Sequence, residues 1–257
     1  MKPIKLLILS DCHLEAQSQQ KAPSSVSNIA FEKVVQNIKQ CCSHPSSQAA
    51  FDLIIGLGDI CQHGDLQSYL YFKTQIEMLQ PADYVVLPGN HDISATMVKV
   101  FDKKSVQSMQ VASFGTLQLI MLNSQWPNKE AGRLSPDLMQ TLKQQLSEQQ
   151  CLSTLIFLHH PVLNLDTPWM DKIALTNAQA FLDLCVQFPH VKAIVHGHAH
   201  QDRELSYQHL AIHSIPSTAY QYKPHCEDVE IDSGGPAYAI ITSDEQQQIR
   251  RQTVYVD

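Results

Sequence analysis

The sequence predicts an α/β fold in a single domain. Short apolar runs, typical of buried strands, alternate with segments whose apolar residues recur at helical spacing. Five of the apolar runs end in Asp, Asn or His. The chain has neither an internal repeat nor a linker rich in Pro, Gly and Ser, so we predict one domain over residues 1–257.

The composition argues against several classes of protein. Of the 257 residues, 44% are hydrophobic, which is enough for a sizeable core, but no apolar run approaches the roughly 20 residues of a membrane span. The net charge of −7 argues against a nucleic-acid surface. This charge is also unfavourable for an anionic substrate unless bound cations compensate for it.

Cysteine usage and the start of the chain both point to the cytoplasm. The seven Cys include no Cys-x-x-Cys pair, and we expect free thiols in or near the core. Residues 1–10 read as a strand and lack the apolar region and cleavage site of a signal peptide. We therefore expect a cytoplasmic monomer or homodimer without a membrane or nucleic-acid partner.

The first hundred residues alternate strands and helices. We predict strands at 4–9, 51–57 and 84–87, a helix from Asn28 to about Cys42, and a helix at 66–79. Residues 14–27 are polar and are expected to form an exposed loop, and residues 43–50 a surface turn. Ser94 is expected to cap a short helix that ends at Phe101.

The remaining chain begins with a hairpin and ends in strands. The hairpin pairs residues 111–115 with 117–123, and Ser135 and Pro136 start a helix that runs to about Gln149. Thr176 is expected to cap a second helix, which ends near Phe188. Further strands are predicted at 154–158, 191–195, 203–207, 209–215, 237–242 and 251–256.

Metal-binding side chains follow five of these strands. They are Asp11 and His13; Asp59; Asn90 and His91; His159 and His160; and His198 and His200. Strand ends gather at one edge of a mostly parallel sheet, so we expect these groups to lie close together. Residues two apart in an extended segment share a face, so each Asp-x-His or His-x-His pair could bind one metal. Cys12, between two such residues, would pack into the core on the opposite face.

The ligand types indicate two metal ions. Taken alone, a strand-end Asp is more often a cap and a lone His more often a hydrogen-bonded structural residue than a metal ligand; their joint occurrence favours a site. Nitrogen and oxygen ligands without Cys exclude a structural zinc finger and fit two adjacent divalent ions of Mn, Fe, Co or Zn. Asp59 is the natural bridge, because it alone lacks an adjacent ligand partner. A hydroxide between the ions would attack phosphorus in line.

In this order, Asp-x-His, Gly-Asp, Gly-Asn-His-Asp, His-x-Pro and Gly-His-x-His resemble the motifs of the calcineurin-like metallophosphoesterase superfamily. The resemblance implies a four-layer α/β/β/α sandwich of two mixed sheets flanked by helices, with a dimetal site at one edge. It implies that one metal is held by Asp11, His13, Asp59 and His200. The other would be held by Asp59, Asn90, His159 and His198.

The same resemblance implies roles for three further residues. His91 would act on the leaving group as an acid. Asp92 would support the catalytic residues from outside the ligand shell, and its carboxylate could orient a neighbouring imidazole. His159 occupies the His-x-Pro frame, so His160 is expected to be a supporting residue.

Later segments resemble the bacterial class III cyclic-AMP phosphodiesterases. They are Asn123-Ser124-Gln125, Gly132-x-Leu134-Ser135, Trp169-Met170-Asp171, Phe188-Pro189-His190-Val191-Lys192, Pro216-Ser217-Thr218 and residues 221–226. This resemblance implies hydrolysis of 3′,5′-cyclic AMP to 5′-AMP. Substrate contacts are expected from His13, His63, Asn90, His91 and His200.

Three alternatives to this function stay open. The substrate could be another phosphodiester, such as a 2′,3′-cyclic nucleotide or a nucleotide diester, or it could be a phosphomonoester. The chain could also be a non-catalytic binding scaffold on the same fold. Residues 14–27 and 161–175 are expected to shape the specificity.

Overall fold

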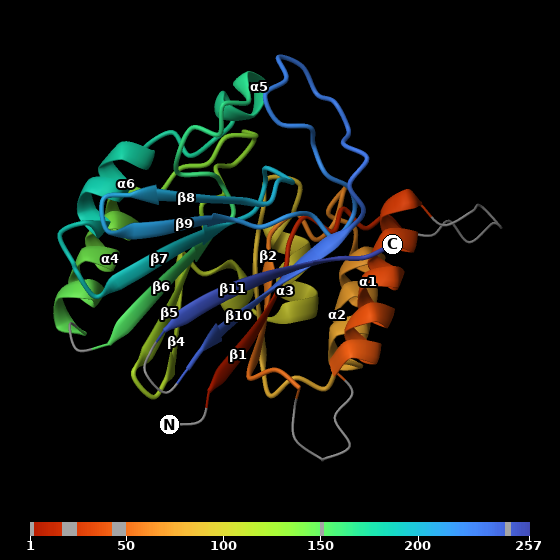
Figure 1. Ribbon diagram of the computed structural model, residues 1–257, viewed down its shortest axis with the longest axis horizontal. Coiled ribbons are helices and arrows are strands. Elements are labelled where there is room, and N and C mark those ends of the chain that lie inside the picture. The colour runs from red at the N-terminus through yellow and green to blue at the C-terminus, as the bar shows by residue number, and fades with distance from the viewer. Residues whose placement is uncertain (1–2, 17–24, 43–49, 150–151, 245–247) are drawn as a thin grey trace.

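The computed structural model describes residues 3–16, 25–42, 50–149, 152–244 and 248–257. Two β-sheets pack face to face, and helices cover the outer face of each sheet (Figure 1). This α/β/β/α arrangement confirms the predicted fold class. The described residues contain no helix with both the length and the apolar character needed to cross a membrane.

The first sheet has the strand order β11-β10-β1-β2-β3. Its strands are β1 (Ile4–Leu9), β2 (Leu53–Leu57), β3 (Tyr84–Leu87), β10 (Ala237–Ser243) and β11 (Ile249–Tyr255). The first three run parallel, whereas β10 and β11 extend the sheet in antiparallel pairs. The helices of this half are α1 (Val26–Cys42), α2 (Leu66–Glu77) and α3 (Ser94–Phe101).

The second sheet has the order β4-β5-β6-β7-β9-β8. Its strands are β4 (Met109–Phe114), β5 (Leu117–Leu122), β6 (Ser153–Leu158), β7 (Val191–His196), β8 (Arg203–Tyr207) and β9 (Leu210–Ser214). The four inner strands are parallel, and the two edge strands are antiparallel. The remaining helices are η1 (Lys104–Val106), α4 (Pro136–Glu148), α5 (Pro168–Asp171) and α6 (Ala178–Cys185).

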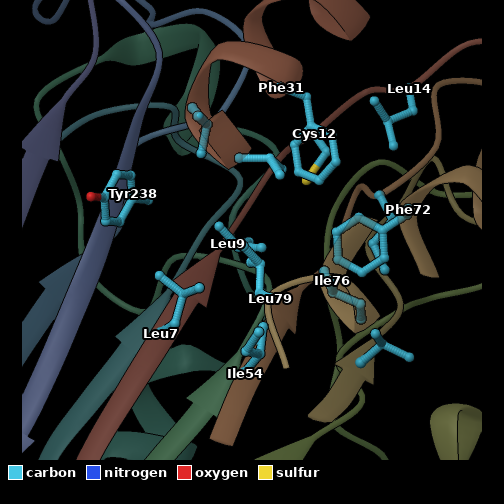
Figure 2. Close-up of a cluster of buried hydrophobic side chains, with 14 of the residues drawn as sticks. Leu7, Leu9, Cys12, Leu14, Phe31, Ile54, Phe72, Ile76, Leu79 and Tyr238 are labelled. Carbon is cyan, nitrogen blue, oxygen red and sulfur yellow. The ribbon is translucent and has the colours of Figure 1, made fainter. Parts of the chain in front are cut away.

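Strand β1 shows why the apolar runs are continuous. Leu7 and Leu9 pack under the helices with Phe31 and Phe72, as Figure 2 shows. Leu6 and Ile8 face the other way and pack between the two sheets. A strand buried on both faces needs apolar residues at every position, which produces a run without alternation.

Two predicted helix caps are wrong. Ser94 is the first residue of α3, and its hydroxyl donates to Gln125 Oε1. Thr176 lies before Asn177, the residue that precedes α6, and its hydroxyl donates to the carbonyl of Gly132. In both cases the hydroxyl donates its hydrogen bond to a residue distant in sequence instead of accepting one from the first turn of the helix. The predicted cap at Ser135 is confirmed.

Two helix boundaries differ from the prediction, and one short helix was not predicted. Helix α1 begins two residues earlier than expected, and α6 ends at Cys185 rather than near Phe188. Helix α5 was not predicted, because four residues are too few to show helical periodicity. Most of the predicted loop at 14–27 and turn at 43–50 lies outside the described residues. Cys12 is buried in the core between the first sheet and its helices and is a free thiol, as predicted.

Candidate dimetal site

Backbone pairing beyond the strand ends brings the predicted ligands together. Past β1 and β2, the amide of Asp11 donates to Gly58 O at 3.0 Å and that of His13 donates to Asp59 O at 2.9 Å. The amide of His198 then donates to both carboxylate oxygens of Asp11, at 3.1 and 3.0 Å. This contact joins the end of β7 in one sheet to the end of β1 in the other.

The donor atoms form overlapping groups. Within each group, one atom from each residue lies within 4.8 Å of the others; the groups are Asp11, His13 and His200; Asp59, His159 and His198; and His13, Asp59 and His91. Asp59 Oδ2 lies 3.8 Å from His13 Nε2 and 3.3 Å from His159 Nε2. Asp59 belongs to the second group and is also close to His13 of the first, so the Asp and His side chains are positioned for two metal ions.

The backbone at these strand ends is left-handed rather than extended. The φ angles are 54° at Asp11, 45° at His13, 48° at Asp59, 66° at His198 and 49° at His200. The expectation that alternating residues converge because the segment is extended is therefore wrong. Non-glycine residues adopt this conformation at an energetic cost, and such strain is concentrated at functional sites.

Asn90 carries a buried polar atom that has no hydrogen-bond partner among the described residues. Its side-chain Oδ1 is buried and accepts no hydrogen bond within the described part of the chain. A buried amide oxygen without a donor is unfavourable, and a divalent cation is a suitable partner. Its position beside His91, whose amide donates to Asp59 Oδ1 at 2.9 Å, fits the predicted second metal site.

Pairs of imidazoles point at each other across the site. His13 Nε2 lies 3.0 Å from His200 Nε2, and His198 Nδ1 lies 3.3 Å from His159 Nε2. Two such nitrogens cannot both be acceptors without a proton or a cation between them. The second ring nitrogens contact Gln62 Oε1, Tyr220 O and Leu57 O, at 2.6, 2.8 and 2.9 Å from His13, His200 and His159. These acceptors fix the rings with the other nitrogen toward the site.

Burial and neighbouring charges shift the pKa values of the buried Asp and His side chains. Burial raises the pKa of Asp59, but the charge and hydrogen bond of His159, with the charges of His13 and His91, together hold it well below its ordinary value. Burial lowers the pKa of His159, yet the charge and hydrogen bond of Asp59, with weaker effects of Asp11 and the carbonyl of Leu57, together raise it to about 9. Burial and the charge of His200 lower the pKa of His13 to about 4. Divalent cations would bind between these facing nitrogens and carboxylates, so the residues fit a metal pair.

His91 and Asp92 differ in what they contact. His91 lines the site, and its Nδ1 contacts the carbonyl of Gln62 at 3.1 Å. The carboxylate of Asp92 accepts from three backbone amides and a phenol, namely Gly89 N, Ile60 N, Cys61 N and Tyr69 OH. The expectation that Asp92 orients an imidazole is therefore wrong. Asp92 instead holds the backbone that carries Asp59 and Asn90.

Two other predicted residues are not members of the ligand groups. His160 is buried, with Nδ1 2.8 Å from Ser124 Oγ and Nε2 3.0 Å from Glu130 O, so it supports the segment before Gly132. His63 is exposed and is not part of the pocket lining described below. Its contact with substrate stays a prediction.

Sequence reasoning missed three supporting residues. Ser10 donates its hydroxyl to Asp11 Oδ2, Gln62 contacts both His13 and His91, and Tyr220 holds His200 through its carbonyl. Ser10 and Gln62 are polar residues close to predicted ligands, and that proximity was a usable signal. The carbonyl of Tyr220 carries no signal in the side-chain sequence.

The site opens into a pocket of 360 Å³. One wall, the ligand wall, consists of His13, Asp59, Asn90, His91, His198 and His200. The other, the aromatic wall, consists of Trp169, Met170, Ile173, Tyr222 and Val229. The carboxylate-bearing Glu130 lies at the same pocket. This volume is within the range of small-molecule sites.

The fold and the strand-end ligands together define a metal-dependent phosphoesterase architecture. The family model described as Calcineurin-like phosphoesterase matches residues 4–202, and the chain belongs to this family. This confirms the superfamily resemblance of the sequence motifs.

The curated relatives carry cyclic-nucleotide names. The chain is 33% identical over 240 residues to the 3′,5′-cyclic adenosine monophosphate phosphodiesterase CpdA of Vibrio vulnificus (strain CMCP6), across 93% of this chain and 85% of that protein. It is 29% identical over 236 residues to the protein of that name from Escherichia coli (strain K12), across 91% of this chain and 83% of that protein. These matches confirm the narrower resemblance.

Solved structures share the fold at low sequence identity. A dimetal phosphatase from Danio rerio superposes with a TM-score of 0.69 at 11% identity, covering 99% of both chains. The purple acid phosphatase PPD1 from yellow lupin gives a TM-score of 0.70 at 10% identity, covering 99% of this chain and 52% of that one. These likenesses support the fold.

Proposed function

We propose that the protein is a dimetal phosphodiesterase that hydrolyses 3′,5′-cyclic AMP to 5′-AMP. The observation that carries the proposal is the pair of ligand groups on either side of Asp59, next to the unpartnered Oδ1 of Asn90. The names of the curated relatives support the choice of cyclic AMP. The proposed setting is the cytoplasm, as a monomer or homodimer acting on a small molecule.

The ligand assignment follows the two groups. Asp11, His13 and His200 would hold one metal; Asn90, His159 and His198 would hold the other; and Asp59 would bridge them. Two divalent ions, of Fe, Mn, Zn or Co, would supply an activated water and neutralise the charge that develops on phosphorus. This positive charge would also offset the net charge of −7 that disfavours an anionic substrate.

His91 is the proposed acid for the leaving group. It lies in the ligand wall, and its ring centroid is 4.9 Å from that of His13, so it would be beside a phosphate bound at this wall. The carbonyl of Gln62 accepts from Nδ1–H, which would leave Nε2 to deliver a proton to the departing 3′ oxygen. His13, Asn90 and His200 would contact the phosphate oxygens; His63, at the surface, is the remaining proposed contact.

A substrate comparison tests the function. We would incubate Mn²⁺-reconstituted protein with 3′,5′-cyclic AMP and, separately, with bis(4-nitrophenyl) phosphate, and would follow 5′-AMP and nitrophenol. We expect turnover of both, abolished by chelator and restored by Mn²⁺. Turnover of the aryl diester alone would retain the metal site and reject cyclic AMP, with 2′,3′-cyclic nucleotides and phosphomonoesters assayed next. No turnover of any phosphoester by metal-loaded protein would favour a binding scaffold.

A further inference from the structure

The aromatic wall of the pocket differs in chemical character from the ligand wall. Five of its residues are aromatic or aliphatic: Trp169, Met170, Ile173, Tyr222 and Val229. Within the described ranges, no Lys or Arg lines the pocket, and the carboxylate of Glu130 is its only acidic group apart from Asp59. This wall therefore offers no cation to a second phosphate; its polar groups are the Trp169 N–H, which has no hydrogen-bond partner in the described residues, and the Tyr222 hydroxyl. It suits a flat, uncharged group.

A chain of ring contacts connects this wall to the metal ligands. The ring of Tyr222 stacks on that of His200, with centroids 4.4 Å apart and planes inclined by 29°. The ring of Trp169 meets Tyr222 edge-on at 4.9 Å. A group attached to a phosphate at the ligand wall would therefore meet the rings of Tyr222 and Trp169 next to His200.

Two segments distant in sequence are tied together to build the wall. Figure 1 shows α5 beside the segment that connects β9 to β10. Helix α5 packs on Ala199, the residue between two ligand histidines. The buried hydroxyl of Thr167 accepts from the amide of His225 at 3.2 Å and from Gln201 Nε2 at 3.3 Å. The carboxylate of Asp171 also binds the amides of Leu165 and Thr167. Such ties fix the wall before a ligand binds, which favours affinity.

Val229 is an exposed apolar residue of this wall. The residue is 57% exposed, although it lines the pocket. A single exposed aliphatic residue is ordinary at a surface, but this one lines the same pocket as Ile173 and Trp169. A ligand lying between the two walls would cover it.

From this geometry we infer that Trp169, Tyr222 and Val229 form the subsite for the base of a mononucleotide that carries one phosphate. The inference rests on the proposed function and adds the residues that select the substrate. The phosphate lies at the ligand wall, and the neutral heteroaromatic base lies against the aromatic wall. Substrates with a second phosphate are disfavoured, because Glu130 repels it and no cation of the described lining compensates.

A substrate without a base isolates this subsite. We would measure kcat and KM for 3′,5′-cyclic AMP and for ribose 3′,5′-cyclic phosphate, which has the same reacting bond. In Trp169→Ala, we expect KM for cyclic AMP to rise about tenfold, the size of one lost base–aromatic stack. The kcat and both constants for the base-free substrate should stay within about twofold, and Trp169→Phe should recover most of the loss.

Two further variants serve as controls. Trp126, the other tryptophan, packs against Arg133 with 5.2 Å between the guanidinium and the ring centroid and does not line the pocket, so Trp126→Ala should leave both substrates unaffected. Val229→Ala removes exposed apolar surface and should raise KM for cyclic AMP about twofold, with no effect on folding.

The outcomes separate this inference from the proposed function. Wild-type turnover of cyclic AMP with no advantage over the base-free substrate would overturn the subsite and leave the function intact. Equal loss on both substrates in Trp169→Ala would also overturn it, because the residue would then support the metal site. Failure of wild-type protein on cyclic AMP would overturn both.

Discussion

The two walls of the pocket are built in opposite ways. The ligand wall comes from the ends of buried strands in both sheets, where residues such as Asp11 and His198 are joined by backbone hydrogen bonds. The aromatic wall comes from the four-residue α5 and from a connecting segment that carries the exposed Val229. The difference suggests that the strand ends position the residues of the hydrolytic reaction, while short segments outside the sheets determine the substrate specificity.

The largest effect should come from removing the bridge in the ligand wall. Asp59→Ala removes the carboxylate between both ligand groups, and we expect turnover to fall by at least about 10³-fold. Metal analysis should find fewer than two ions per chain. The matched control is Asp83→Ala, an exposed carboxylate beside β3, which should change neither value. Full turnover with two ions bound to Asp59→Ala would show that Asp59 is not the bridge.

Removing the proposed acid should separate chemistry from metal binding. His91→Ala should lower kcat for cyclic AMP by about 10²- to 10⁴-fold, the usual contribution of a general acid. Metal content should be unchanged, because His91 is outside the two ligand sets assigned to the metals. A metal-loaded His91→Ala protein with full activity would remove the residue from the mechanism.

The carboxylate behind the ligand wall should affect stability. Asp92→Asn replaces an acceptor of four hydrogen bonds with a group that places a donor among the same amides. We expect a loss of about 2–4 kcal/mol in the free energy of unfolding, measured in urea with chelator present. Tyr69→Phe, which removes one of these partners, should cost about 1 kcal/mol. Wild-type stability in Asp92→Asn would contradict the supporting role assigned here.

The smallest effect should come from loosening the aromatic wall. Thr167→Val keeps the shape of the side chain but removes the acceptor for the amide of His225 and for Gln201. We expect KM for cyclic AMP to rise a few-fold, with kcat for ribose 3′,5′-cyclic phosphate unchanged. Steady-state assays on both substrates decide this. An equal change for both would mean that Thr167 serves the ligand wall.

The residues of the ligand wall could be predicted from sequence because each proposed ligand lies within a few residues of the end of a continuous apolar run. A strand that is buried on both faces shows a continuous apolar run in the sequence. The carboxyl ends of parallel strands lie at one edge of a sheet, where ligands bind. The predicted reason for convergence at Asp11 and His13 failed, because an alternating pattern cannot reveal a positive φ at a non-glycine residue. The chain-distant contact of His198 with Asp11 was equally invisible.

The aromatic wall could not be predicted from residue patterns. Trp169 and Tyr222 entered only through a resemblance, since neither lies in a segment with recognisable periodicity. Helix α5 is too short to show a period, and the tie through Thr167 joins residues 58 apart in sequence. The roles of Ser94 and Thr176 failed as helix caps for the same reason: their hydroxyls bond to distant residues.

The most direct test of the dimetal centre is to measure how many Mn²⁺ ions bind per chain and whether their spins are exchange-coupled. Metal-free protein would be titrated with Mn²⁺ while turnover and the electron paramagnetic resonance spectrum are recorded together. The geometry of the ligand groups around Asp59 predicts two ions per chain, a spectrum of exchange-coupled Mn²⁺, and activity that appears only when the second ion binds. One ion per chain, or two uncoupled ions with full activity, would contradict the account.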